Sequence, residues 1–369
     1  MTGFRPTVLS VSKQAIQHNV EQVRMLYRQH HQPNVKIFAV IKANGYGHGL
    51  LEVAEAALAA QVDYLAVATF DEALSVREKF EKIPILVLGA SPVHAVPVAV
   101  EKEITLTIPS LKWLKEALTH QMPLKVHLKI DTGMNRIGLK TIDELEEVQA
   151  LLQHSKWYVE GVFTHFSRAD EKDRTWTDQQ VERFEAFLQR LTKRPEIVHV
   201  SNSAATLLYP EYGYDAVRLG ISLYGLSPSP EIAELLPVSL QKVGVLETEV
   251  VAMKRLGADE PLSYGGKYLS KEGEWIATLP IGYADGLKRG LTGQEVLVDG
   301  KRAPIVGTIC MDQCLVLVPE TVKVGTKVTL IGHQGQAEVT ADEWAEKMQT
   351  INYEICTSLS QRVHRILVE

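Results

Sequence analysis

The sequence predicts an α/β fold in which an N-terminal (β/α)8 TIM-type barrel is followed by a mostly β C-terminal domain. Eight short apolar runs alternate with longer segments of helical periodicity from residue 36 onward, and eight is the strand count of a closed barrel. After about residue 238 the segments become short, rich in Val, Thr and Ile, and punctuated by Gly and Asp, which is typical of β structure. We therefore expect a barrel over residues 12–238 and a β-rich domain over residues 239–369.

The eight runs have the unbroken Val, Ile and Leu character of strands that are buried on both faces. They are KIFAVIKA (36–43), DYLAVAT (63–69), PILVLG (84–89), ITLTI (104–108), LKVHLKID (124–131), WYVEGVFTHFS (157–167), EIVHVSN (196–202) and AVRLGIS (216–222). Between them, apolar residues recur every three or four positions in the expected helices 50–61, 110–121, 141–153 and 178–191. An open doubly wound sheet is the alternative, but no GxGxxG turn follows the first run.

The second domain is predicted from short Val- and Thr-rich segments that continue toward the end of the chain. They are KVGVLETEVVAMKRLG (242–257), EWIATLPIGYADG (274–286), the segment 294–319 and KVGTKVTLIG (323–332). One helical piece, TADEWAEKMQT (340–350), interrupts them. The extended TVLSVS (7–12) precedes the first helix of the barrel, so we expect residues 1–11 to pair with this domain.

Composition and charge exclude several classes of protein. The formal net charge of −6 gives no basic surface for nucleic acid, and no apolar run reaches the ~18 residues of a membrane span. The N-terminus lacks the apolar segment of a signal peptide. The three cysteines are too few for a disulfide framework, and Cys310 and Cys314 have no second pair at zinc spacing. We therefore expect a cytoplasmic protein without a metal site.

Polar residues gather where the expected strands end, which is where a (β/α)8 barrel carries its chemistry. The first run ends in Lys42, and a polar, Gly-rich loop follows it over residues 43–49. The later runs, or the loops behind them, contribute Lys129, Arg136, His165, His199, Ser203 and Arg218. These side chains are therefore expected to converge on one face of the barrel.

Lys42 is the most informative of these residues. A lysine at the end of an apolar strand has its stem in the barrel mouth, where desolvation lowers the pKa of the amine and frees it for Schiff-base chemistry. The alternative is a lysine that extends along the barrel rim to reach water. The Gly-rich loop behind Lys42 and the polar residues on the later strands favour the first interpretation.

The ends of the last two runs are suited to a phosphate. Ser203 offers a hydroxyl, and the backbone amides of Gly220 and Ile221 can approach an anion closely because Gly220 has no side chain. The alternative for Ser203 is that it caps the helix that follows, and both roles are compatible. No GxxxxGK[ST] motif is present, so a nucleoside triphosphate is not expected.

Two arginines and a histidine lie on the same rim. Arginines usually form salt bridges at the surface, and this is the alternative for both Arg136 and Arg218. Arg218 stands within an apolar run, so we expect it to bind a ligand or a buried acceptor instead. For His165 the sequence leaves three roles open: a general base, a stacking platform and a structural histidine.

At these residues the chain resembles the alanine racemase family. The segment AVIKANGYGHG (39–49) is similar to the lysine-bearing signature of that family almost letter for letter. The other similar blocks, in the family's order, are LKIDTGMNRIG (128–138), FTHFSRAD (163–170), SNSAA (201–205), VRLGISLYG (217–225), LSYGGKY (262–268), IGYADG (281–286), CMDQ (310–313) and INYEI (351–355). The resemblance spans essentially the whole chain, and the first block is the most specific.

The resemblance implies pyridoxal 5′-phosphate as the cofactor and the interconversion of L-alanine and D-alanine, which supplies D-alanine for cell-wall peptidoglycan. It also implies a head-to-tail homodimer in which the β-rich domain of one subunit completes the other's active site. Lys42 would carry the cofactor as an aldimine and act as the base for D-alanine. Tyr264 of the partner subunit would be the opposing base for L-alanine, since racemisation removes a proton on one face and returns one on the other.

The same resemblance implies roles for further residues. The other cofactor contacts would be Tyr46, His165, His199, Ser203, Arg218, Gly220, Ile221 and Tyr353. Arg136 would bind the substrate carboxylate or the phenol oxygen of the cofactor, and the backbone of Met311 would meet the carboxylate from the partner subunit. Lys129 aligns with a lysine that many members carry as a carbamate, an anion that would hold Arg136. The substrate access channel would be lined by Asp170, Tyr283, Tyr353 and Arg289.

Arg218 has a further implication for the chemistry. Many pyridoxal enzymes place an Asp against the pyridine nitrogen, which keeps that nitrogen protonated and makes the ring a strong electron sink. An arginine has no proton to give at ordinary pH. Arg218 would therefore leave the pyridine neutral and discourage transamination.

The sequence departs from the family pattern at two positions and leaves other functions open. Thr308 stands where members often have an arginine in the channel, and His364 replaces the proline of the usual RVPR ending. A racemase for serine or a broader set of small amino acids is one alternative, since a small pocket discriminates a single hydroxyl poorly. A barrel-type pyridoxal-phosphate amino-acid decarboxylase is another, against which Arg218 argues. A regulatory protein without turnover is a third, against which the β-rich domain and Tyr264 argue.

Overall fold

The computed structural model describes residues 4–369, which form two compact units. One unit consists of residues 14–45 and 53–241, and the other of the described part of 1–13 with 46–52 and 242–369. Residues 1–3 of the expected pairing segment 1–11 lie outside the described residues.

The short segment 46–52 falls in the β-rich unit, although it lies within the range 12–238 expected for the barrel. Arg365 Nε donates a hydrogen bond of 3.0 Å to the carbonyl oxygen of Gly47. A Cβ at Gly47, whose φ is +82°, would lie 2.0 Å from the carbonyl oxygen of Cys356. Only glycine allows this approach of two backbones, and the contact explains why the segment packs with the second unit.

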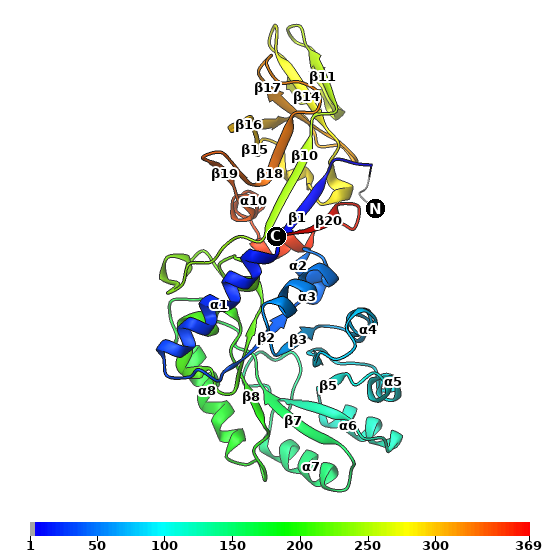
Figure 1. Ribbon diagram of the computed structural model, residues 1–369, viewed down its shortest axis with the longest axis vertical. Coiled ribbons are helices and arrows are strands. Elements are labelled where there is room, and N and C mark those ends of the chain that lie inside the picture. Colours follow the sequence, from blue (N-terminus) through cyan, green and yellow to red (C-terminus); the bar gives the residue numbers. More distant parts are fainter. Residues whose placement is uncertain (1–3) are drawn as a thin grey trace. The chain divides into compact units, whose positions relative to one another are not determined.

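The larger unit is a barrel of eight parallel strands, which confirms the predicted fold class (Figure 1). The strands are β2 (Lys36–Val40), β3 (Tyr64–Val67), β4 (Ile85–Val87), β5 (Thr105–Ile108), β6 (Lys125–Lys129), β7 (Tyr158–Phe163), β8 (Ile197–His199) and β9 (Ala216–Leu219). They pair in chain order, and β9 pairs in turn with β2. Backbone hydrogen bonds from Asp215 to Val198 (3.0 Å) and from Arg218 to Ser201 (3.1 Å) join the last two strands and close the barrel.

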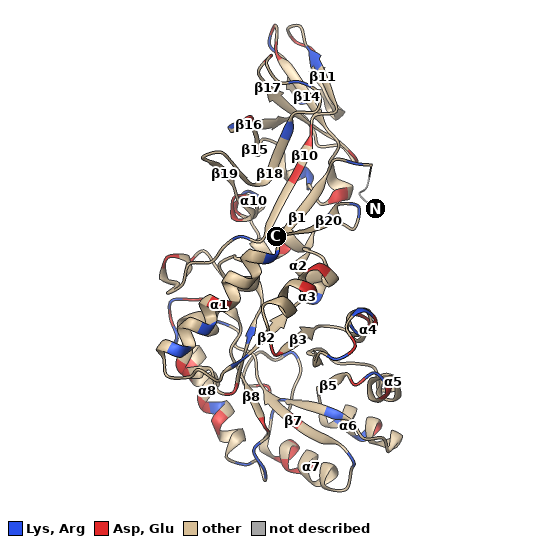
Figure 2. Cartoon of the chain, viewed as in Figure 1, with Lys and Arg blue, Asp and Glu red and all other residues tan. Residues whose placement is uncertain are grey.

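Helices cover the outside of these strands, as Figure 1 shows for α4 to α7. The helices of this unit are α1 (Lys13–Gln29), α3 (Leu50–Ala59), α4 (Phe70–Lys79), α5 (Val96–Glu101), α6 (Leu111–Ala117), α7 (Ile142–Gln153), α8 (Thr175–Leu188) and α9 (Ser203–Leu208). Acidic and basic residues are interspersed along these helices (Figure 2). Two helices begin with a reciprocal capping box, formed by Thr69 with Glu72 on α4 and by Thr141 with Glu144 on α7.

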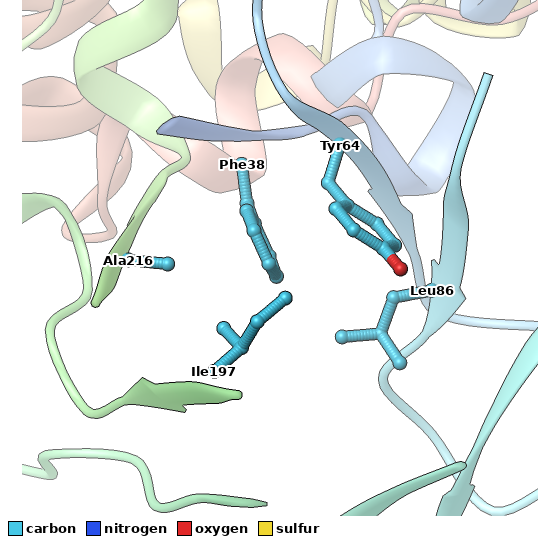
Figure 3. Close-up of a cluster of buried hydrophobic side chains, with 5 residues drawn as sticks. All are labelled: Phe38, Tyr64, Leu86, Ile197 and Ala216. Carbon is cyan, nitrogen blue, oxygen red and sulfur yellow. The ribbon is translucent and has the colours of Figure 1, made fainter. Parts of the chain in front are cut away.

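The interior of the barrel is filled by side chains. Figure 3 shows a cluster of Phe38, Tyr64, Leu86, Ile197 and Ala216, which come from five different strands and point toward one another. The rings of Phe38 and Tyr64 lie with their centroids 4.5 Å apart. This packing leaves the ends of the strands as the place for a site.

The second unit is mostly β, as predicted. Its strands are β1 (Val8–Ser12), β10 (Gly244–Glu249), β11 (Ala252–Arg255), β12 (Pro261–Leu262), β13 (Tyr268–Leu269), β14 (Trp275–Leu279), β15 (Glu295–Val298), β16 (Lys301–Val306), β17 (Cys314–Val318), β18 (Lys327–Gln334), β19 (Ala337–Val339) and β20 (His364–Val368). Most of them form one sheet in the order β11-β14-β17-β16-β15-β18-β10-β1-β20. The first strand pairs antiparallel with β10 and parallel with β20, so both ends of the described chain lie in this sheet.

Two short helices interrupt the β structure, where the sequence predicts one. The expected helix is α10 (Ala341–Met348), and a second helix, α11 (Asn352–Thr357), follows it. Six residues are too few to show a helical period, which explains why α11 was not predicted. Within residues 4–369, no helix combines the length and the apolar character needed to cross a bilayer.

Candidate active site

Lys42 begins a backbone turn of rare conformation, labelled α2 (Lys42–Tyr46), just beyond the end of β2. Ala43, Asn44 and Gly45 have φ angles of 52°, 55° and 60°, and Tyr46 follows at 50°. Left-handed backbone costs an L-residue roughly 1–2 kcal/mol, so such a run persists only where its surroundings hold it. Strained backbone of this kind is concentrated at functional sites, and here it lies directly behind the lysine.

The Lys42 amine is half-buried in a positively charged environment. Burial lowers its pKa below the ordinary value, and the guanidinium groups of Arg136 and Arg218 lower it further. The carboxylate of Glu72 acts in the opposite direction without reversing the shift. A larger fraction of this amine is therefore neutral and nucleophilic at ordinary pH than for an exposed lysine.

Arg218 is 3% exposed, and backbone carbonyls at the ends of neighbouring strands hold its guanidinium. Nη2 donates to the carbonyl oxygens of Val200 (2.8 Å) and Thr164 (2.9 Å), and Nη1 donates to that of His199 (3.0 Å). Two imidazole nitrogens also face it, Nδ1 of His199 at 2.9 Å and Nδ1 of His165 at 3.3 Å. Because a guanidinium only donates, Nδ1 of His199 must be an unprotonated acceptor, whereas the two Nη2 hydrogens are directed to carbonyl oxygens that lie closer than Nδ1 of His165.

Both histidines are held in the neutral form. Burial, followed by the charge of Arg218, lowers the pKa of His165 and that of His199 well below the ordinary value. The His199 ring also stacks on Phe163 with the centroids 4.7 Å apart and the planes 8° apart. Of the roles left open for His165, the geometry favours that of a structural histidine, with its Nδ1 3.3 Å from Nη2 of Arg218.

The structure corrects the capping role considered for Ser203. The N-cap of α9 is Asn202, whose side chain accepts a hydrogen bond of 3.2 Å from the amide of Ala205. The hydroxyl of Ser203 instead accepts one of 2.8 Å from the backbone amide of Gly220. Ile221 follows within a buried 3-10 turn, Ile221–Tyr224. The loop after β8 and the loop after β9 are thereby joined where the sequence predicted a phosphate site.

Lys129 is another buried amine, 2% exposed, whose Nζ donates a hydrogen bond of 2.6 Å to the carbonyl oxygen of Ile130. Burial lowers its pKa to about 7, and Arg218 and Arg136 contribute to the shift against the opposing charge of Asp131. Arg136 itself is exposed on the loop after β6. The charges of Arg136 and Arg218 lower the pKa of Lys129, which shows an excess of positive charge at the barrel mouth. Such an environment favours an anionic ligand.

The residues expected from the β-rich unit lie on its turns. Tyr264 is 72% exposed and begins the 3-10 turn Tyr264–Gly266. Thr308 Oγ1 donates a hydrogen bond of 2.9 Å to the carbonyl oxygen of Tyr264, and Ser263 Oγ donates one of 2.5 Å to the carbonyl oxygen of Thr308. The departure at Thr308 therefore has a structural role in this chain, because it ties down the turn that carries Tyr264.

The remaining channel and carboxylate residues of this unit are also placed. Met311 is 53% exposed, and its carbonyl oxygen accepts a hydrogen bond of 3.0 Å from the amide of Ala284. Tyr283 is partly exposed, and Arg289 lines a cavity of about 820 Å³ together with Thr308. Tyr46 packs near Tyr353, with ring centroids 6.0 Å apart.

Two other expected positions have no specific role in this geometry. In the barrel unit, Asp170 is half-buried, and burial raises the pKa of its carboxyl group. In the β-rich unit, the departure His364 is exposed at the start of β20. Within the described chain, no group of His, Cys, Asp and Glu side chains could hold a metal ion.

Three further residues, Glu72, His127 and Glu160, extend the contacts of the predicted site. Glu72 accepts a hydrogen bond from the amide of Ala43, and His127 and Glu160 continue the contacts of His199 into the barrel. The alternation of 125, 127 and 129 in LKVHLKID places His127 on the same strand face as Lys129, a signal that could have found it. Glu72 and Glu160 have no such signal.

Comparisons with known proteins agree with this geometry. The family model described as the N-terminal domain of alanine racemase matches residues 11–228, and that of the C-terminal domain matches residues 243–367. The alanine racemase of Geobacillus stearothermophilus is 46% identical over 366 residues, which cover 98% of this chain and 93% of that protein. The alanine racemase of Listeria monocytogenes serotype 4b (strain F2365) is 44% identical over 368 residues, or 99% of each chain.

Solved structures give the same result. The crystal structure of alanine racemase from Bacillus anthracis with bound L-Ala-P superposes with a TM-score of 0.95 at 42% identity, covering 100% of this chain and 96% of that one. A histidine racemase from Leuconostoc mesenteroides subsp. sake superposes with a TM-score of 0.94 at 31% identity, covering 100% and 99%. The barrel, the residues of the site and these matches along its whole length all lead to the same conclusion: the chain belongs to the alanine racemase family of enzymes.

Proposed function

We propose that this chain interconverts L-alanine and D-alanine with pyridoxal 5′-phosphate as its cofactor. Membership of the family supports the reaction class, and the names of the full-length relatives support alanine as the substrate. The observation that carries the proposal is the Lys42 amine, whose pKa is lowered by burial and by Arg136 and Arg218 at the end of a barrel strand. A neutral amine in a cationic mouth is what an anionic aldehyde cofactor requires.

The residues of the candidate site fit this cofactor. Lys42 would hold it covalently, and Ser203 with the amides of Gly220 and Ile221 would hold its phosphate. The guanidinium of Arg218 would face its ring nitrogen. When bound, the cofactor supplies an electron-withdrawing ring that makes the α-hydrogen of an amino acid acidic enough to remove. Tyr46 and Tyr353 would complete the phosphate contacts, and His165 and His199 would support Arg218.

Two bases then move the proton. Once the amino group of the substrate has displaced it from the cofactor, Lys42 Nζ would take the α-hydrogen of D-alanine on one face, and the hydroxyl of the partner's Tyr264 would return a proton to the same carbon on the other face. For L-alanine the roles exchange, with the phenolate as base and the Lys42 ammonium as acid. Each turnover leaves one base protonated and the other deprotonated, so the protons balance when the two bases exchange with water.

The remaining residues would bind and guide the substrate. Arg136 would bind the substrate carboxylate or the phenol oxygen of the cofactor, and the backbone of Met311 would contact the carboxylate from the partner subunit. Lys129, as a carbamate, would hold Arg136. The access channel would be lined by Asp170, Tyr283, Tyr353 and Arg289.

The active unit is proposed to be a homodimer with shared sites. A tyrosine that is 72% exposed in a single copy is unusual for an aromatic side chain, and this supports docking of the Tyr264 turn against a second copy. The three cysteines are free thiols, which supports a reducing compartment, the cytoplasm. There the product D-alanine would supply cell-wall peptidoglycan.

The test is isotope exchange during racemisation. Purified protein with pyridoxal 5′-phosphate is incubated with L-alanine in D₂O, and optical rotation and α-deuterium are followed together. We expect loss of rotation with deuterium in both enantiomers, and at least 10²-fold slower rates for Lys42→Ala and Tyr264→Phe. Retention of rotation and of the α-hydrogen would overturn the proposal. L-serine and L-histidine serve as competing substrates, because a relative of this chain is named a histidine racemase.

A further inference from the structure

A chain of buried polar side chains leads from Arg218 through the barrel interior. Nη1 of Arg218 lies 2.9 Å from Nδ1 of His199, and Nε2 of His199 lies 2.8 Å from Nδ1 of His127. Nε2 of His127 lies 3.1 Å from Oε2 of Glu160. The four residues come from β9, β8, β6 and β7, which are consecutive strands of the barrel. Both histidines are fully buried, and Glu160 is 7% exposed.

Only one arrangement of protons satisfies every link in this chain. The guanidinium of Arg218 only donates, so Nδ1 of His199 accepts. A neutral imidazole then has its proton on Nε2, which donates to Nδ1 of His127. His127 in turn has its proton on Nε2 and donates to the carboxylate of Glu160. All three hydrogen bonds therefore point in one direction, from the guanidinium toward the carboxylate.

The charges of the surroundings support this arrangement. Burial, with the charges of Arg218 and Lys125, lowers the pKa of His127 even though Glu160 acts in the opposite direction. Burial raises the pKa of Glu160, but hydrogen bonds from His127, Tyr64 and Lys125 outweigh it and lower the value to about 2. The carboxylate is therefore anionic, and burial with Arg218 likewise keeps His199 neutral.

The anionic end of the chain is held in place by its neighbours. The Tyr64 hydroxyl donates to Oε2 of Glu160, and Lys125 Nζ lies 2.9 Å from Oε1. Val126 pairs with Val159, whereas His127 pairs with Gly161, so Glu160 is the extra residue of a β-bulge.

The ring of His127 also has a defined position. A Cβ at Gly161 would lie only 2.5 Å from Nδ1 and Cε1 of His127. The glycine therefore leaves the space that this ring occupies, and the imidazole lies directly against the backbone of β7.

We propose that Glu160 is a positioning residue for Arg218 and acts through His127 and His199. Its carboxylate can accept hydrogen bonds but has none to donate. It therefore sets which nitrogen of each histidine in this hydrogen-bonded series carries the proton. A lone pair of His199 is thereby always presented to the guanidinium. If the acceptor were lost, His127 could carry its proton on Nδ1, and the reversed chain would set an N–H of His199 against an N–H of Arg218. The part that concerns catalysis rests on the proposed function.

The proton positions are measured directly by two-bond ¹H–¹⁵N NMR of the full-length protein labelled with ¹⁵N-histidine. Of the 12 histidines, His127 and His199 are assigned by the signals lost in His127→Gln and His199→Gln. We expect both to be neutral, with the proton on Nε2. A proton on Nδ1 of either ring, or an imidazolium, in the unsubstituted protein would overturn the proposal.

Three variants then test the role of the carboxylate. Glu160→Leu removes the acceptor, and we expect it to shift the proton of at least one ring and to lower kcat for L-alanine about tenfold with KM little changed. Glu160→Gln keeps an oxygen that can accept from His127, so we expect it to restore both the proton positions and kcat. Leu86→Ala, in the cluster of Figure 3, is the control for lost packing and should change neither.

The outcomes separate this inference from the proposed function. Unchanged proton positions in Glu160→Leu, or equal changes in Leu86→Ala, would overturn the positioning role. The protein could also racemise no amino acid and still have the expected proton positions, lost only in Glu160→Leu. That result would refute the proposed function and still support the role of Glu160 in setting the proton positions of the two histidines.

Discussion

The carboxylate of Glu72 accepts a hydrogen bond of 2.7 Å from the backbone amide of Ala43, the residue that follows Lys42. The same carboxylate accepts from the amides of Ala68 (2.8 Å) and Thr69 (3.2 Å) as part of the capping box of α4. One side chain thus joins the loop after β3 to the left-handed turn after β2. The cap of a neighbouring helix helps to hold the strained backbone behind Lys42.

Glu72→Gln is expected to loosen this turn. An amide nitrogen replaces one accepting oxygen, so either the turn or the capping box loses its partner. We expect kcat to fall about tenfold and bound pyridoxal 5′-phosphate to dissociate faster, because a small displacement of a reacting group is costly. The control is Glu144→Gln on α7, whose carboxylate accepts, within residues 4–369, only from Lys140 and Thr141 at its own helix end. Gln keeps one oxygen that can accept from both amides and serves in a capping box as Glu does, so that variant should leave kcat unchanged. Equal kinetic losses in both variants would contradict this role of Glu72.

Lys129 is expected to react with carbon dioxide. Its pKa of about 7 leaves much of the amine neutral near neutral pH, and the neutral amine adds CO₂ to give a carbamate and a proton. The carbamate should therefore form as the pH rises through about 7 and be lost below it. ¹³C NMR with labelled bicarbonate measures it. A carbamate signal that persists in Lys129→Met, or its absence from the unsubstituted protein at pH 8, would refute the prediction.

Thr308 is expected to affect turnover through its hydrogen bond to the carbonyl oxygen of Tyr264. Thr308→Val has nearly the same shape but cannot donate, so the turn that carries Tyr264 gains freedom. We expect kcat for L-alanine to fall about tenfold in this variant and to stay within about twofold in Thr308→Ser, which keeps the hydroxyl. Steady-state kinetics of the two variants decide the matter, and equal rates would show that the hydrogen bond is unimportant.

Ser203 is expected to stabilise the fold as well as the site. In protein freed of the cofactor, whose phosphate would itself accept from this amide, Ser203→Ala leaves the buried amide of Gly220 without its acceptor, which should cost about 1–3 kcal/mol of unfolding free energy. Thr206 on the same helix is a matched control, because its buried hydroxyl makes no hydrogen bond within the described chain. Thr206→Val should therefore be neutral or stabilising. Denaturant unfolding of the two variants measures the difference, and similar losses would argue against the Ser203–Gly220 link.

Most of the fold could be predicted because its signals are local. The unbroken apolar run 124–131 contains β6 (Lys125–Lys129), and the periodic stretch 141–153 contains α7 (Ile142–Gln153). The short helix α11 was missed because it is too short to show a period. The place of segment 46–52 in the β-rich unit depends on the close approach of Gly47 and Cys356, which are distant in sequence.

The site was predictable as a set of residues but not as a set of contacts. Lys42 and Ser203 stand at strand ends that the sequence identifies. Asn202 and Ser203 are equally good helix caps, and the amide of Gly220 decides which of them caps α9. Nothing local predicts that Ala43 adopts a positive φ, since that conformation is unfavourable for alanine and depends on contacts from elsewhere.

The sequence by itself determined the order of strands and helices, the position of Lys42 at the end of the first barrel strand, and the motifs that the chain shares with its family. Only the tertiary structure decided which polar atoms meet. The link from Arg218 through two histidines to Glu160 joins four strands and depends on the closure of the barrel and on the bulge at Glu160. Hydrogen-bond partners are set by distances of a few tenths of an ångström between strands far apart in the chain, and local propensity does not encode such distances.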